Sequence, residues 1–480
     1  MKPQRASTRT AIALSSLLLL CLGWGDTLHA RQEIPAISSG PDSVIISDID
    51  ISGNDITKDW VILRELQLKI GDRVHRATLD SILQKEADKI FNTDLFVTSN
   101  IGYETSPYNE VELSVAVLEK WYTFPVPALD FGDRNFNEWW QNQDRDLSRL
   151  VYGFTFKRNN FRGRNEKLTL GFKLGFRKNL KLRYEIPYVN KEQTLGTGWL
   201  AEYKTLNNVA YSTEGNRLAF ASTDESLRRE LYLDWKFWYR KDFYTRHTWK
   251  AAYRKIDITD SLYQLNPRYL YENQQSARLF EFSYQVDHDL RNIQAYPTDG
   301  SFFSGRITQQ IGLEGFFRTQ LSASYTHFFP LSDSFFFSSA FKGHYTWSNR
   351  NNFSFLPGAG YNNDIIRGYD LYVITGEAIG ISRNTLRMKL LDRNINLGFM
   401  PFKQFSVIPV GIYPKLFFDM GYVSNSQADF FERDRFSNRL LKGWGAGLDI
   451  FTAYNAVIRF EYSMNQAGES GLFVYWAVDI

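Results

Sequence analysis

Cysteine, long apolar segments and catalytic motifs are nearly absent from this sequence of 480 residues. Its one cysteine, Cys21, lies in an N-terminal stretch that we expect to be removed. A mature chain without thiols excludes disulfides, thiolate catalysis and Cys-ligated metals. No glycine-rich phosphate loop, His-Glu-x-x-His motif or nucleophile-elbow serine occurs. We therefore expect a protein that is not an enzyme and has no cofactor.

The histidines also give no reason to expect a metal site. Six are scattered along the chain, and only Asp287-His288-Asp289 resembles a set of metal ligands. Because this triplet falls at an expected strand end beside a turn, we interpret it as a solvated hinge. Glu225 and Glu230 lie in an expected loop and carry no acid–base signature.

Charge and hydropathy exclude two further classes of protein. The formal net charge of +3 does not indicate a nucleic-acid-binding surface. The mean hydropathy of −0.36 excludes a helical membrane protein, but it is typical of a transmembrane β-barrel. In a barrel, polar lumenal residues alternate with apolar lipid-facing residues, so their average is low. The aromatic content of 16% fits two girdles at the membrane interfaces.

The first 30 residues have the pattern of an export signal. A positively charged start precedes an apolar stretch over residues 11–22, and residues 28–30 offer a cleavage site. The apolar stretch is short for a membrane-spanning helix, which needs about 20 residues, although a retained N-terminal anchor is the alternative. Residues 31–42 are expected to be a polar linker.

Residues 43–120 mix strand and helix signals. We expect a strand near residues 44–51, one helix opened by Thr57 and another opened near Thr78, then strands over 97–104 and 110–118. This order predicts a small α+β domain in which two helices cover one sheet.

From residue 148 to residue 480 the pattern is that of strands alone, after a linker over residues 121–147. Apolar and polar residues alternate persistently, as in residues 166–176, 180–186 and 280–286. Soluble β-sandwiches also alternate, but the export signal and the length of the pattern favour an antiparallel transmembrane barrel. Sixteen strands are expected, beginning near residues 149, 166, 180, 195, 208, 228, 244, 278, 301, 316, 334, 380, 406, 443, 456 and 471.

These features together resemble the BamA/TamA-type superfamily, the bacterial surface antigen type, in which POTRA domains precede a sixteen-stranded outer-membrane barrel. Nearly the whole mature chain is covered. Residues 160–163 are similar to the family's first barrel hairpin, and the long loop before the twelfth strand contains the family's Arg-Gly-aromatic motif. The matching positions are Gly53, Asn54, Gly71, Asp72 and Phe96 in the POTRA-like region, Pro297 and Gly300 in a periplasmic turn, and Arg367, Gly368, Tyr369 and Asp419 in the barrel.

The resemblance implies that Arg367 folds back into the lumen and pairs with Asp419. A guanidinium can fix a long loop through directed, charge-assisted hydrogen bonds to a carboxylate. Gly368 would permit a backbone conformation that a side chain forbids. The alternative is that residues 367–369 form an ordinary surface turn.

Three features depart from the family pattern. Thr385 stands where many members have a second acidic residue, so we expect Asp419 to be the single acidic partner of the loop. The chain ends in Ile480, not in an aromatic residue, and the POTRA-like domain is single.

The resemblance implies a protein of the bacterial outer membrane with a periplasmic domain. Its implied function is assembly or insertion of outer-membrane proteins, or translocation of proteins across that membrane, by strand templating at a seam between strands at residues 149–157 and 471–480. Partners would be outer-membrane lipids, unfolded client proteins and envelope lipoproteins, with no nucleic acid. The alternatives are a structural barrel of an envelope complex and a small diffusion channel.

Overall fold

The computed structural model describes residues 42–131, 147, 150–270, 274–350, 352–361, 364–401, 403–426 and 434–477. The export signal expected over residues 1–30, the linker up to residue 41, Cys21 and Ile480 lie outside the described residues. None of the helices in the described part of the chain is long and apolar enough to cross a membrane.

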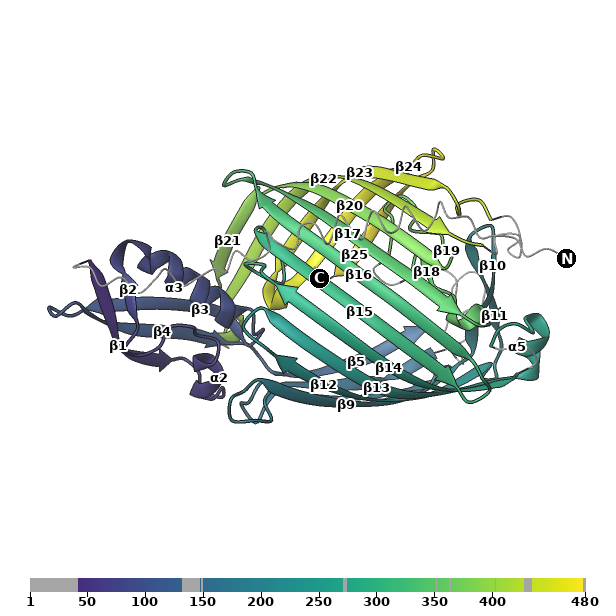
Figure 1. Ribbon diagram of the computed structural model, residues 1–480, viewed down its shortest axis with the longest axis horizontal. Helices are drawn as coiled ribbons and strands as arrows, with labels where there is room; N and C mark the ends of the chain where they lie inside the picture. Colours follow the sequence, from purple (N-terminus) through teal and green to yellow (C-terminus); the bar gives the residue numbers. More distant parts are fainter. Residues whose placement is uncertain are drawn as a thin grey trace.

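A small α+β domain and a large barrel make up the molecule (Figure 1). In the domain, the sheet has the order β2-β1-β4-β3, and β1 runs parallel to β4. Alternate residues of β4 are buried on one face, from Val111 to Val117, and both helices pack there. The α+β prediction is confirmed. The elements are β1 (Ser43–Ser52), α2 (Asp59–Leu63), β2 (Arg73–His75), α3 (Arg76–Phe91), β3 (Phe96–Thr105) and β4 (Glu110–Glu119).

The barrel is closed and consists of seventeen strand elements in the described residues. Two of them, β20 and β21, pair one after the other with the same strand β22, so the wall has sixteen strand positions. The wall strands are β5 (Thr123–Phe131), β6 (Leu150–Phe161), β7 (Glu166–Gly175), β8 (Asn179–Ile186), β9 (Leu195–Leu206), β12 (Arg228–Arg240), β13 (Thr245–Ile258), β14 (Ser276–Asp289), β15 (Gly300–Gly312), β16 (Phe317–Pro330), β17 (Phe335–Ser348), β20 (Ala378–Met388), β21 (Leu391–Asn396), β22 (Val407–Ser424), β23 (Leu440–Thr452), β24 (Ala456–Asn465) and β25 (Ser470–Ala477).

The expected number of wall strands agrees with this count, but two of the expected assignments are wrong. The strand expected near residue 208 is β10 (Asn208–Glu214), which pairs with β11 (Arg217–Ser222) in a separate hairpin outside the wall. The residues expected to link the domain to the barrel contain β5, which pairs with β6 and is therefore a wall strand. The two errors cancel in the total.

The alternation of apolar and polar residues along the wall strands corresponds to their two faces, as the sequence suggests. Outward positions are apolar and exposed, for example Leu182, Phe282 and Leu321, whereas inward positions such as Glu230 and Glu281 are polar and buried. The strand order places β25 beside β5, where the two ends of the wall meet. Because no edge is left open, the backbone groups of the wall can all be paired within the ring.

The α+β domain contacts one end of the barrel, called here the near end. The turn between β6 and β7 lies against it: the Lys58 amide donates to the carbonyl of Gly163 at 3.0 Å, and Asn160 donates to the Thr57 hydroxyl at 2.7 Å. Gly163 has φ of +72°, and a Cβ there would lie 2.1 Å from the Ile56 carbonyl oxygen. Only glycine permits this close approach.

A buried ion pair joins the domain to a second part of the rim. Arg240, at the end of β12, donates two hydrogen bonds of 2.8 Å to the Glu65 carboxylate, which is 3% exposed. At the C-terminal end of α3, Asn92 exchanges hydrogen bonds with the backbone of Asn292 and Gln294. The domain is thus held to several turns of the rim.

The Glu65–Arg240 pair should make the junction sensitive to acid. Burial by itself would raise the pKa of Glu65, but the charge and hydrogen bonds of Arg240, together with the charges of Arg64 and Lys89, leave this pKa below its ordinary value. Such a carboxylate contributes stability that is complete above its unfolded pKa of about 4.3 and is lost as pH falls through the folded value.

We expect Glu65→Gln to weaken the junction at pH 7 by about 1.5–3 kcal/mol, the usual worth of hydrogen bonds to a charged group. Hydrogen exchange in the turn at residues 241–244 measures it, and it should rise in the wild type only below about pH 4. Glu112→Gln, on the exposed face of β4, is the control. Equal exchange in both variants would show that the pair does not hold the junction.

Candidate functional site

A long loop between β17 and β20 enters the barrel. It includes the short strands β18 (Gly358–Ala359) and β19 (Ile374–Thr375) and the 3₁₀ turn η2 (Phe353–Phe355). Its tip, residues 364–370, packs against β22 and β23 at positions where the wall carries glycine. A Cβ at Gly443 would lie 1.8 Å from the Arg367 carbonyl oxygen, and one at Gly421 would lie 2.1 Å from Ile366. The wall is thus shaped to receive the tip.

The structure brings Arg367 and Asp419 together inside the barrel. The guanidinium donates to both carboxylate oxygens, at 2.8 and 2.5 Å, and the Arg367 amide donates a third bond at 3.1 Å. The two side chains are 3% and 0% exposed. The guanidinium also lies 4.0 Å from the centre of the Phe417 ring. Residues 367–369 are therefore not a surface turn.

More polar groups surround this pair than the sequence suggested. Thr385 accepts a hydrogen bond from Arg367 at 3.0 Å, and Glu461 on β24 lies 3.7 Å from the same guanidinium. Asp419 is therefore not the single acidic neighbour of the loop, because Glu461 replaces the acidic residue missing at position 385. Its inward position in an alternating strand was the available signal, but nothing in the sequence placed β24 beside the loop.

Further toward the near end, the cluster continues with Lys415 and Asp449. Lys415 pairs with Asp449 and, at 2.6 Å, with Glu461. Tyr296 donates to Asp449 at 3.0 Å and stacks on Tyr413 with ring centres 4.5 Å apart. Each of the carboxylates of Asp419, Asp449 and Glu461 thus lies within 4 Å of at least two cationic side chains, as burial of charge requires.

Gly368 and Tyr369 complete the tip. Gly368 has φ of +95°, and a Cβ there would lie 2.7 Å from the Met464 carbonyl oxygen. The Tyr369 side chain is buried and packs edge-to-face with Phe436, with the two ring centres 5.2 Å apart. Position 368 therefore has no room for a side chain, whereas position 369 needs an aromatic ring to pack against Phe436.

The other residues singled out from the sequence lie apart from the loop tip. Pro297 and Gly300 lie in the near-end turn between β14 and β15, where Gly300 has φ of +96°. In the α+β domain, Gly53 and Gly71 also have positive φ, and Asn54, Asp72 and Phe96 make local turn or core contacts. Asn54 donates to the Thr57 carbonyl, Asp72 accepts from the Lys69 amide, and Phe96 is fully buried.

Asp287, His288 and Asp289 do not form a metal site. Asp287 pairs with Arg246 at 3.3 Å, and Asp289 pairs with Arg291 at 2.6 Å. Among the residues that the structure describes, no group of three His, Cys, Asp or Glu side chains could hold a metal ion.

The end of the barrel away from the α+β domain, the far end, is crossed by the β10–β11 hairpin. In the strand order, β9 and β12, from which the hairpin arises, lie opposite β22 and β23. Its tip residue Asn216 donates to Asp434 at 2.9 Å and accepts from the Arg435 amide at 2.7 Å. The Asn216 carbonyl also accepts from the Val373 amide of the long loop. The hairpin therefore joins opposite sides of the far mouth.

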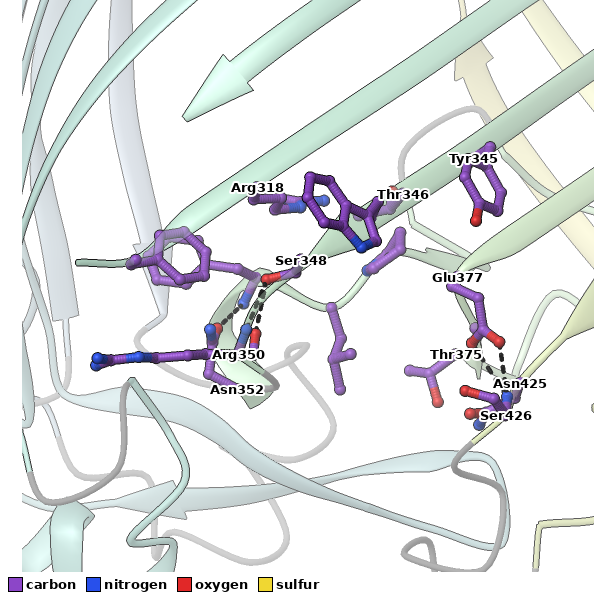
Figure 2. A pocket seen from close by; sticks show the side chains of 16 residues that line it. Arg318, Tyr345, Thr346, Ser348, Arg350, Asn352, Thr375, Glu377, Asn425 and Ser426 are labelled. Carbon is purple, nitrogen blue, oxygen red and sulfur yellow. Dashed lines mark hydrogen bonds between the residues drawn. The ribbon is translucent and has the colours of Figure 1, made fainter. Parts of the chain in front are cut away.

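A pocket of about 250 Å³ lies beside the long loop at this end. Figure 2 shows Arg318, Thr346 and Ser348 of the wall on one side and Glu377 and Ser426 on the other. The Glu377 carboxylate accepts from the Ser426 amide at 2.8 Å. The pocket thus lies between the wall and the loops of the far end.

A closed ring of strands with an apolar exterior, a polar interior and an attached α+β domain defines a β-barrel protein of the bacterial outer membrane. The family follows from the sequence comparisons: the chain belongs to the Omp85 superfamily, because the model of the Omp85 superfamily domain matches residues 160–471. A POTRA model, described as surface antigen variable number repeat, matches residues 44–120. The near end is therefore periplasmic and the far end extracellular.

A comparison with solved structures found similar chains. The chain is similar to CdiB from Escherichia coli, with a TM-score of 0.51 and 13% identity over 90% of this chain and 75% of that chain. It is also similar to BamA from Haemophilus ducreyi lacking POTRA domains 1–3, with a TM-score of 0.47 and 17% identity over 90% and 84% of the two chains. A search of curated proteins found no match.

Loss of the buried loop anchor should be costly. We expect Arg367→Ala to destabilise the barrel by about 3–5 kcal/mol, because it leaves the Asp419 carboxylate buried without its main partner. Urea titration of the folded, heat-modifiable band on gels measures this. Lys255→Ala, which removes an ammonium from a pair whose two side chains are 39% and 41% exposed, should change stability by no more than about 0.5 kcal/mol. Equal midpoints for both variants would contradict an anchoring role of Arg367.

Proposed function

We propose that this protein assists assembly or insertion of outer-membrane proteins by offering a strand edge at the seam between β5 and β25. The observation that carries the proposal is the composition of β5. It contains Pro125 and Pro127, and proline has no N–H to donate to a ladder. Residues two apart in a strand face the same neighbour, so one ladder of β5 lacks two donors.

A strand held by fewer hydrogen bonds is the easiest to displace from the ring. An opened seam would expose unpaired backbone groups, and these are natural sites for addition of another strand. A client strand would pair there before folding further, without covalent chemistry, so the proposal includes no enzyme activity. The seam strands are β5 and β25, which corrects the expectation that the seam begins at residues 149–157.

The POTRA domain would receive clients by the same type of pairing. The sheet order leaves β3 (Phe96–Thr105) at an edge, and much of its surface is exposed. Unfolded outer-membrane or secreted proteins are the proposed partners, together with the surrounding lipids and envelope lipoproteins.

A structural role in an envelope complex is the second candidate. It is favoured by the attachment of the POTRA domain to several turns of the rim, through contacts such as Glu65–Arg240 and Asn92–Asn292. The diffusion-channel alternative is disfavoured, because the long loop lies within the barrel and the β10–β11 hairpin crosses its extracellular mouth.

Restoring the two donors of β5 should tighten the ring. We expect Pro125→Val with Pro127→Val to stabilise the barrel by about 1–3 kcal/mol, at about 0.5–1.5 kcal/mol for each added backbone hydrogen bond, and to slow insertion of clients. Urea titration and a liposome insertion assay measure the two effects. Pro409→Val in β22, away from the seam, is the control and should leave insertion unchanged. Unaltered insertion by the double variant would argue against seam opening.

Depletion of the protein tests the proposed function in cells. We expect quantitative proteomics of the outer membrane to show a loss of barrel proteins accompanied by a periplasmic stress response. A broad loss indicates general assembly, and loss of one or two proteins indicates a dedicated insertase or exporter. An unchanged outer membrane would refute the assembly proposal and leave the structural role.

A further inference from the structure

The tip of the long loop does more than contact β22 and β23, because it also bonds to the last hairpin of the barrel. The side chain of Asn465, at the end of β24, donates to the Gly368 carbonyl at 2.9 Å. Tyr372 donates to Glu469, in the turn between β24 and β25, at 2.9 Å. Asn465 and Glu469 are in turn bonded to each other at 3.0 Å. The loop therefore holds both ends of the turn that leads into β25.

A third contact reaches β25 itself. The hydroxyl of Tyr475 donates to a carboxylate oxygen of Asp370. The other Asp370 oxygen accepts from the Gly368 amide at 2.8 Å. One carboxylate thus joins the backbone of the Arg-Gly turn to an inward-facing side chain of the closing strand. Leu472 and Val474, which alternate with Tyr475, are 69% and 60% exposed on the outside of the barrel.

From these contacts we infer that the loop tip braces the closing strand, with Asp370 and Tyr475 as the positioning pair that couples the Arg367–Asp419 anchor to the seam. While the tip is docked, β25 is held from inside the barrel as well as by its ladders. When the tip leaves its seat, β25 loses this restraint and the seam can open. The inference rests on the proposed function for its purpose, but the restraint itself can be measured without any client.

The position of the Asp370–Tyr475 contact explains why it can restrain β25. β25 pairs with β24 over residues 470–477, and its other neighbour is β5, the strand with two prolines. The Asp370 contact approaches β25 from the lumen and is independent of both ladders. It can therefore restrain β25 even where backbone pairing is incomplete, and it can be released without breaking the β24–β25 hairpin.

Hydrogen exchange of the full-length protein in lipid nanodiscs tests the brace. Tyr475→Phe removes one hydroxyl and keeps the ring. We expect exchange of the amides of residues 471–477 to become about tenfold faster, as loss of a hydrogen bond to a charged group implies, with little change in β13–β16. Asp370→Ala should have the same effect, and combining it with Tyr475→Phe should add little. Asp370→Asn, whose amide oxygen still accepts, should retain part of the protection.

Tyr462→Phe is the matched control. The hydroxyl of Tyr462, in β24, bonds to the side chain of Ser470, in β25, at 3.1 Å. This bond lies on the lipid-facing side of the wall and does not involve the loop. Protection of β25 that is unchanged in Tyr475→Phe, or lost equally in Tyr462→Phe, would overturn the inference. Faster exchange confined to β25 in the first variant would support it. If depletion left the outer membrane unchanged, the assembly function would fail while the exchange result still decided the brace.

Discussion

The structure depends on the requirement that every backbone N–H and C=O within a membrane be paired by the protein itself. For strands this means a closed ring, and a ring made from one chain has a single place where its first and last strands meet. Here β5 and β25 meet after the chain has passed once around the barrel. Among the wall strands that the structure describes, β5 is the first and β25 the last in chain order, so no turn or loop links them directly and their junction depends on other contacts.

The buried charges of the lumen specify an arrangement more than they stabilise one. Desolvation offsets much of the attraction between buried ions, but a single ion left without its partner is strongly destabilising. Arg367 therefore has one acceptable position, beside Asp419 and near Glu461, and this position fixes the loop. Gly368, Gly421 and Gly443 make the same choice by steric means, because a Cβ at any of them would collide with its neighbour. The ion pairs and the steric fit therefore both specify the same position for the loop tip.

Sequence reasoning predicted the wall because its alternation has a single physical cause, an apolar exterior around a polar lumen. The prediction missed β5 because prolines such as Pro125 and Pro127 are typical of linkers, and proline in a strand normally marks an edge or a bulge. The strand β10 was wrongly predicted to lie in the wall, because apolar and polar residues alternate in a hairpin outside the wall as they do within it. Arg367 and Asp419 could be proposed from motifs, whereas Glu461, Asp370 and Tyr475 could not, since only the strand order brings β24 and β25 beside the loop.

The prolines and the brace can be understood together. The two prolines of β5 remove two donors from one of its two ladders, so this strand is held by fewer hydrogen bonds than its neighbours, and a restraint on β25 from the lumen adds to what the ladders supply. In this barrel the deficit lies in β5 and the additional restraint acts on β25 through Asp370, so the two features work on opposite sides of the same junction. Such a division lets the resting ring stay closed, while a single movement, withdrawal of the loop tip, removes the lumenal restraint on β25 and leaves the seam to its ladders alone.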